Sequence, residues 1–140
     1  MFVRGAITGI MLLAAALAAS GQQPADEIRM SIFFPGGSYY IDDQQIHELN
    51  EWLDSIPNLL ETYEIHLISH TDPIGGREFN EMLSRMRSAA VQRLLVQHLI
   101  PENRISIKDW GLDNPVYSND THGGREMNRR VDVILYPVIF

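Results

Sequence analysis

An acid and an arginine are the side chains of this sequence whose types and placement best suit ligand binding. Asp72 ends the motif S-H-T-D at 69–72, and Arg87 lies within N-E-M-L-S-R-M-R-S-A-A-V at 80–91. A carboxylate accepts hydrogen bonds from an ammonium group, and a guanidinium donates two parallel bonds to a carboxylate. A ligand that carries an ammonium and a carboxylate on one carbon would satisfy both side chains. The spacing leaves open that Asp72 and Arg87 simply pair with each other.

The segment around Arg87 has the spacing of one helix face, although several of its side chains are polar. Asn80, Ser84, Arg87 and Val91 stand at i, i+4, i+7 and i+11, which on a helix form one narrow stripe. Because the apolar end of this stripe must face a core, its polar end is held at the edge of that core. Asn80 is equally suited to be the N-cap of this helix.

The pattern of apolar residues and turn residues predicts the elements that position these side chains. Strands are expected at 29–34, 64–69, 104–110 and 131–138, with a polar loop over 118–124. One helix is expected after Asp42 and Asp43 and ends at Pro57, and a longer one is expected over 79–100 and ends at Pro101. This order predicts an α+β fold, a two-layer α/β sandwich in which two main helices cover one face of a mixed sheet.

The N-terminal segment has the composition of an export signal. Residues 1–21 place Arg4 before an apolar run rich in alanine and leucine, and small residues follow. The sequence predicts a signal peptide cleaved between positions 18 and 23, a short leader over 22–28 and one domain over 29–140. An uncleaved membrane anchor is the alternative, although the run is shorter than the roughly 20 residues that span a bilayer.

Charge and cysteine content exclude several classes of partner and chemistry. The net charge is −7, from 11 basic and 18 acidic residues, and loss of Arg4 with the signal would make it about −8. Such an acidic chain is a poor candidate for binding nucleic acid or an anionic membrane surface. The absence of cysteine excludes disulfides, a lipid anchor on an N-terminal cysteine and thiolate chemistry.

Several spaced motifs resemble one family. S-H-T-D at 69–72, F-N at 79–80, L-S-R-M-R-S at 83–88, W-G at 110–111, N-P at 114–115 and T-H-G-G-R-E-M-N-R-R-V at 121–131 resemble the OmpA-like peptidoglycan-binding domain. The pattern of that family runs G-H-T-D, Y-N, L-S-x-x-R-A and then G-R-x-x-N-R-R-V. The resemblance extends over about 29–135, with the motifs in the same order.

The resemblance implies non-covalent binding of peptidoglycan through the diaminopimelate residue of its stem peptide, with no catalysis, metal or cofactor. Asp72 would bind the amino group, Arg87 the carboxylate, and Arg130 would line the same pocket. The ligand-binding positions that it implies are Asp72, Arg87, Asn80, Arg130, Thr71, Leu83 and Asn128. It also implies a periplasmic protein that acts alone or with an envelope protein that supplies its anchor.

The sequence departs from the family pattern at the end of the first strand. Small polar residues usually follow a phenylalanine and an aspartate there, whereas this chain has Phe34-Pro35-Gly36-Gly37. One wall of the expected pocket is therefore in question. Without the resemblance, residues 128–130 are better explained as a solvated basic turn than as part of a site.

Two rival hypotheses remain. His70, Asp72 and His122 are the residue types of a zinc or general-base cluster, which would make the protein a hydrolase. Alternatively, the altered 35–37 edge would suit a module that binds periplasmic proteins, or a subunit of an envelope machine, whose ligand pocket has drifted.

Overall fold

The computed structural model describes residues 26–72, 74–109 and 121–138. Within these residues no helix is both long enough and apolar enough to cross a membrane. The predicted signal peptide and most of the leader, the W-G motif at 110–111 and the N-P motif at 114–115 lie outside the described residues, so the structure does not test them.

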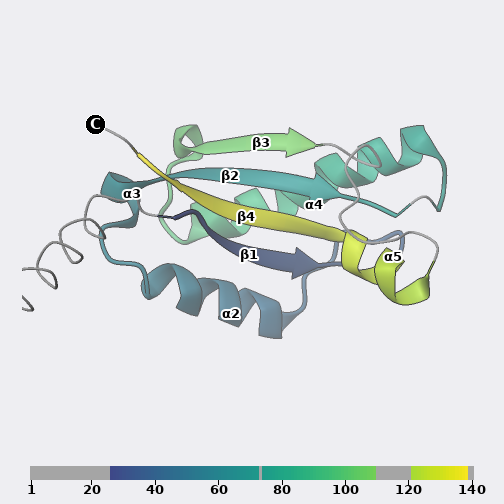
Figure 1. Ribbon diagram of the computed structural model, residues 1–140, viewed down its shortest axis with the longest axis horizontal. Coiled ribbons are helices and arrows are strands. Elements are labelled where there is room, and N and C mark those ends of the chain that lie inside the picture. The colour runs from purple at the N-terminus through teal and green to yellow at the C-terminus, as the bar shows by residue number, and fades with distance from the viewer. Residues whose placement is uncertain (1–25, 73, 110–120, 139–140) are drawn as a thin grey trace, which may run out of the picture.

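The described residues form four strands and two long helices, as the sequence predicts, together with shorter helical segments (Figure 1). The strands are β1 (Ile28–Phe33), β2 (Tyr63–His70), β3 (Ile105–Asp109) and β4 (Arg130–Pro137). The helices are α2 (Asp43–Asp54), α3 (Leu59–Thr62), α4 (Arg77–Gln97), the 3-10 turn η1 (Glu102–Arg104) and α5 (His122–Asn128).

The strands form one mixed sheet in the order β1-β4-β2-β3. β4 lies in the interior and pairs antiparallel with both β1 and β2, whereas β2 and β3 are parallel. Parallel neighbours need a crossover, and α4 supplies it. In Figure 1, β1 and β2 end at the same side of the sheet, where α4 and β4 begin. The loops after β1 and β2 therefore meet at this end.

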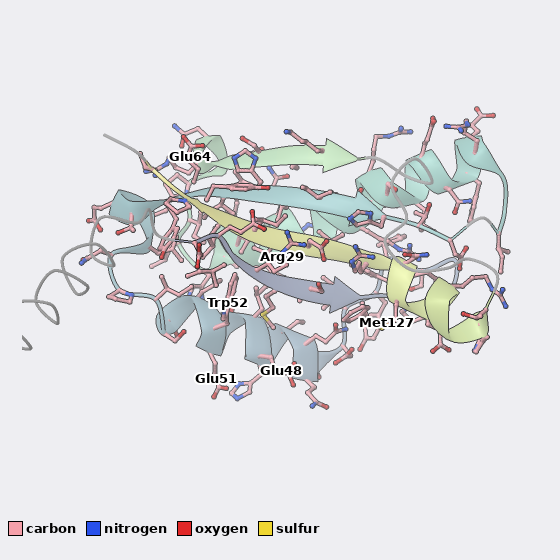
Figure 2. All side chains as sticks on the ribbon, viewed as in Figure 1. Arg29, Glu48, Glu51, Trp52, Glu64 and Met127 are labelled. Atoms are coloured by element: carbon pink, nitrogen blue, oxygen red, sulfur yellow. The ribbon has the colours of Figure 1, made fainter. Side chains whose placement is uncertain are left out.

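The apolar side chains of one sheet face form a single core with both long helices. Leu67 pairs with Val133 and Ile65 with Leu135, and all four are fully buried against Leu49 and Leu53 of α2 and Val91 and Leu95 of α4. In Figure 2, Trp52 lies on the side of α2 toward the sheet, and Glu48 and Glu51 extend to the opposite side. The predicted two-layer α+β fold is therefore confirmed.

The helix boundaries follow local capping. The predicted cap of α2 is confirmed, since the carboxylate of Asp42 accepts the backbone N–H of Gln45 at 3.0 Å. α4 begins at Arg77 and ends at Gln97, before the predicted Ile100. Its end is set by Leu99, which has a φ of 67° and lets Ile100 N donate to Leu95 O.

The prediction of a loop over 118–124 is wrong for its last residues, because 122–124 are helical. α5 begins at His122, and its N-cap is Thr121, whose hydroxyl accepts the backbone N–H of Gly124 at 2.9 Å. Gly123 and Gly124 made this segment read as a loop, because glycine disfavours helix interiors. The threonine cap offsets this cost and places residues 128–130 beside the ends of β1 and β2.

Candidate functional site

A small pocket lies where the loops after β1 and β2 meet the first half of α4. Its volume is about 140 Å³. It takes its charged groups from three different parts of the chain: the loop after β2, the middle of α4, and the residue before β4. The lining residues are Gly36, Gly37, Asp72, Ile74, Gly75, Phe79, Asn80, Leu83, Arg87 and Arg129.

Arg87 is the most deeply buried charge of this pocket. Its side chain has no exposed surface, and its guanidinium lies 5.1 Å from the centre of the Phe34 ring. Nε donates to the carbonyl of Ser38 at 2.8 Å, and one terminal nitrogen donates to the carbonyl of Pro35 at 3.1 Å. The other terminal nitrogen, Nη1, is buried and has no hydrogen-bond partner among the described residues. An unpartnered cationic donor at a pocket wall is a site for an anionic acceptor.

Burial lowers the pKa of Arg87 to about 10, because the charged form loses its hydration; Asp72 opposes this shift and Arg129 adds to it. The guanidinium therefore still carries its charge at neutral pH. An anion bound at Nη1 would replace part of the lost hydration. The polar stripe predicted on this helix is confirmed, since Asn80, Ser84, Arg87 and Val91 are all buried.

Asp72 pairs with Arg129, and this answers the question that the spacing left open. Oδ2 lies 2.9 Å from Nη1 of Arg129, and Oδ1 accepts the backbone N–H of Ile74 at 3.1 Å. Arg129 also donates from Nε to the carbonyl of Phe34 at 3.2 Å, which ties β1 to the pocket. Each carboxylate oxygen has lone-pair capacity for another donor. The pocket thus presents one held carboxylate and one arginine with a free donor.

Asn80 and Leu83 also line the pocket, where the resemblance places them. The amide of Asn80 donates to the carbonyls of Ile74 at 3.0 Å and Gly76 at 2.7 Å, so its role within the protein is to close the turn between β2 and α4. Gly76, with a φ of 83°, occupies the N-cap position, so the alternative of Asn80 as the cap is wrong. Leu83 supplies an apolar wall.

Arg130, which the resemblance implies in the same pocket, is not among the residues that line it. Its Nε lies 3.0 Å from Asp132 Oδ1, and its Nη1 donates to the carbonyl of Met127 at 3.0 Å. Successive side chains of a strand point to opposite faces. The register pairs Arg130 with His70 and Asp132 with Ser31, so these residues share the face away from the helices. Arg129 lines the pocket in its place.

Thr71 and Asn128, both predicted as ligand contacts, are buried but do not line the pocket among the described residues. The hydroxyl of Thr71 is buried and meets no hydrogen-bond partner within 26–72, 74–109 and 121–138. The residues that sequence reasoning missed are Arg129 and the carbonyls of Pro35 and Ser38. The alternation of side chains along a strand is the signal that could have found Arg129, because it places only one of the two consecutive arginines on the side of the pocket.

The structure does not bring together the residues of the hydrolase hypothesis. His70 Nε2 lies 3.3 Å from Asp132, Asp72 is held by Arg129, and His122 forms an exposed pair with Glu126 at 2.7 Å. In the described part of the chain no three histidine or acidic side chains are placed to hold a metal ion. These three residues therefore form three separate pairs.

The Pro35-Gly36-Gly37 segment completes the wall that the sequence left in question. It folds as a turn in which Ser38 N donates to the carbonyl of Pro35 at 3.2 Å, and Gly37 adopts a φ of 64° that favours glycine. The backbone of this turn faces Arg87 and Gly36 and Gly37 line the pocket. Main-chain atoms thus replace the polar side chains usual in the family.

Comparison with known proteins identifies relatives over most of the chain. Residues 33–129 match the OmpA family. Outer membrane protein Omp38 of Acinetobacter baumannii is 34% identical over 116 residues, which are 79% of this chain and 32% of that protein. The probable lipoprotein YiaD of Escherichia coli is 35% identical over 74 residues, 53% of this chain and 34% of that protein. The chain thus spans about a third of the length of these relatives.

Solved structures share the fold. The peptidoglycan-associated lipoprotein from Burkholderia pseudomallei superimposes with a TM-score of 0.64 at 26% identity, over 76% of this chain and 89% of that one. The cell wall anchor of the T6SS from Pseudomonas aeruginosa gives a TM-score of 0.63 at 21% identity, over 90% of this chain and 94% of that one. From its sequence and its fold together, the chain belongs to the OmpA family.

Proposed function

We propose that this protein binds peptidoglycan without catalysis, through the end of a diaminopimelate side chain in the stem peptide. The observation that carries the proposal is the Nη1 of Arg87, a buried cationic donor that has no partner in the part of the chain that the structure describes. Arg87 lines a pocket that also contains Asp72. The pocket therefore has one unmet need for an acceptor and one carboxylate able to accept a further donor. The free end of diaminopimelate carries a carboxylate and an ammonium on one carbon, which meets both needs.

The shape of the pocket also supports a small charged end group. A volume of about 140 Å³ is below the 300–1,000 Å³ typical of pockets that enclose a whole small molecule. Leu83, Phe79 and Ile74 supply apolar contacts for the methylene groups next to the charged carbon. A site of this size would hold the end of a side chain and leave the rest of the polymer outside.

The relatives agree with a role at the cell wall. A peptidoglycan-associated lipoprotein and a cell wall anchor share the fold, and their names describe attachment and not turnover. We propose that the protein is periplasmic, where peptidoglycan is accessible, and the names of these two proteins support this. Holding a zwitterion requires the two charges and no nucleophile, so the proposed activity is binding alone.

Sedimentation with purified sacculi tests the proposal. The protein is expected to co-sediment with sacculi whose stem peptides contain meso-diaminopimelate and to be released by free meso-diaminopimelate. Sacculi that contain lysine at the same position retain the ammonium but lack the carboxylate, so they should bind much more weakly. Equal binding to both kinds of sacculus would contradict the assignment of Arg87 as the carboxylate receptor.

A variant of Asp72 tests the other half of the site. Asp72→Asn keeps the shape of the side chain and an oxygen for the N–H of Ile74, but it removes the charge that attracts the ammonium. Binding to diaminopimelate sacculi should fall strongly, whereas Asp43→Asn, an exposed acid in the first turn of α2, should leave it unchanged. Unchanged binding by Asp72→Asn would overturn the assignment.

A second candidate function is docking to another envelope protein. Ile74, Phe79, Met82 and Met86 are exposed apolar side chains beside the pocket, with exposed fractions of 63%, 40%, 42% and 36%. The last three follow one face of α4. A chain that fails to bind either kind of sacculus would favour this function over the first.

A further inference from the structure

A second, larger depression lies next to the pocket. Its volume is about 570 Å³, within the range of ligand sites. It lies between the loop after β1, the start of α2 and the second half of α4. The residues that line it are Gly37, Ser38, Tyr39, Tyr40, Ile41, Ile46, Ala90, Arg93, Leu94 and Gln97. We call this depression the tyrosine groove.

The tyrosine groove and the pocket lie on two sides of one short loop. Gly37 lines both, and the carbonyl of Ser38 accepts Nε of Arg87 at 2.8 Å, so the loop crosses α4 at Arg87. A Cβ added at Gly36 or Gly37 would meet no atom within 4 Å. At these two glycines the loop is therefore bare backbone with open space beside it, and a chain-like ligand can pass over them from the pocket into the groove.

The composition of the tyrosine groove suits a carbohydrate. Tyr39 and Tyr40 are 49% and 64% exposed, unusually open for aromatic side chains. Aromatic faces pack against the apolar C–H faces of sugar rings, and the tyrosine hydroxyls can bind sugar hydroxyls. Ile46, Ala90 and Leu94 give an apolar floor for an acetyl methyl group, and Arg93 and Gln97 are donors at the rim. None of the described lining residues is acidic.

The stem peptide is long enough for its sugar to reach the tyrosine groove while its diaminopimelate end lies in the pocket. From Arg87 to Gln97 the helix rises about 15 Å, at about 1.5 Å per residue. The far end of diaminopimelate is separated from the amino sugar by its own side chain and two further residues, and an extended residue spans about 3.5 Å. With the zwitterion in the pocket, a stem peptide laid over Gly36 and Gly37 would bring its sugar to the tyrosines.

We propose that the tyrosine groove is a binding site for the N-acetylated amino sugar to which the stem peptide is attached. The inference rests on the proposed function, because the pocket supplies the anchor point of the same ligand. The groove then makes the protein prefer a sugar-linked stem peptide to the free peptide.

Isothermal titration with two ligands tests the inference. The stem tripeptide that ends in meso-diaminopimelate probes the pocket alone, and the disaccharide tripeptide probes the pocket and the groove together. The unmodified protein should bind the disaccharide tripeptide about tenfold more tightly, the effect expected of one or two aromatic contacts. The Tyr39→Ala, Tyr40→Ala double variant should lose that advantage and bind the tripeptide as before. Arg93→Ala should lose part of it.

Two control variants match these changes. Leu99→Ala removes an exposed apolar side chain and Arg85→Ala removes an exposed positive charge, both outside the groove. Neither should alter the ratio of the two affinities.

The other outcomes would refute the sugar site in the groove, alone or together with the proposed function. Equal affinity of the unmodified protein for the two ligands, or an equal loss of both in the tyrosine variant, would refute the groove and leave the pocket standing. Failure of the unmodified protein to bind either ligand would refute the proposed function and the groove with it. A dimer in sedimentation velocity that the tyrosine variant disperses, with the affinity ratio unchanged, would assign the groove to a second copy of this chain.

Discussion

Arg129 and Arg130 are adjacent in sequence and bind carboxylates on opposite sides of the sheet. Arg129 Nη1 lies 2.9 Å from Asp72 in the pocket, whereas Arg130 Nε lies 3.0 Å from Asp132 on the face away from the long helices. Arg129 thus belongs to the proposed ligand site, and Arg130 to a buried structural cluster. The two can be separated experimentally, because ligand affinity and stability are different measurements.

Exchange of each arginine for glutamine should separate the two roles. Arg129→Gln should weaken binding of the stem tripeptide, because Asp72 loses the partner that holds it at the pocket. Arg130→Gln leaves the carboxylate of Asp132 buried without its cation, and breaking a buried pair costs about 3–5 kcal/mol. Urea unfolding and titration calorimetry of both variants check this. Comparable loss of affinity in a folded Arg130→Gln protein would contradict the placement.

Arg87 is expected to affect both affinity and stability. Arg87→Ala would leave the carbonyls of Pro35 and Ser38 without their donor, and each unsatisfied buried group costs about 1–3 kcal/mol. A destabilised variant is a poor test of binding. Arg87→Lys keeps the charge and one donor for the loop but cannot present the free Nη1 to a carboxylate.

The lysine variant should lose about 2–5 kcal/mol of binding free energy while it keeps most of the stability. Calorimetry with the stem tripeptide and thermal unfolding measure the two quantities. Arg85→Lys, an exposed arginine on the same helix, is the matched control and should change neither. Retention of full affinity by Arg87→Lys would exclude a contact between Nη1 and the carboxylate of the ligand.

The sequence predicted the fold better than it predicted the site, for a physical reason. The elements follow from local signals such as the cap at Asp42 and the alternation of Val131, Val133 and Leu135, which act within a few residues. The pairing of Asp72 with Arg129 depends on how α5 directs the chain into β4. Strand alternation indicates that only one of the two arginines faces the pocket, but no local signal shows which one. The carbonyls that hold Arg87 belong to backbone, which residue types do not reveal.

Because of the cluster around Asp132, the free energy of unfolding should depend on pH in the acidic range. Burial by itself would raise the pKa of Asp132, but hydrogen bonds from His70 and Ser31 and the charge of Arg130 together lower it to about 2. A carboxylate with a lowered pKa in the folded state stabilises the protein above its unfolded pKa, near 3.9. This stabilisation, about 2 kcal/mol, is lost as pH falls from about 4 to about 2.

Urea unfolding across this range is the measurement. The free energy of unfolding should fall from pH 5 to pH 2, and Asp132→Asn should flatten part of that slope while lowering stability at pH 7. Asp43→Asn, which removes an exposed acid, should leave the slope as in the unmodified protein. A slope that is identical in Asp132→Asn would show that another acid carries it.

Gln45 links the edge of the sheet to the loop that builds the site. Its amide pairs with the backbone of Phe33 in both directions, at 2.8 Å from N to Oε1 and 2.9 Å from Nε2 to O, as a neighbouring strand would. Gln45→Ala should therefore cost about 1–3 kcal/mol, from two hydrogen bonds that are partly buried. Because Phe33 leads directly into the Pro35 turn that holds Arg87, affinity for the stem tripeptide should fall as well. Gln44→Ala is the neighbouring control, because the amide of Gln44 donates to the exposed Glu48 at 3.1 Å. If Gln45→Ala lowers stability and leaves affinity intact, the Pro35 turn holds Arg87 without support from α2.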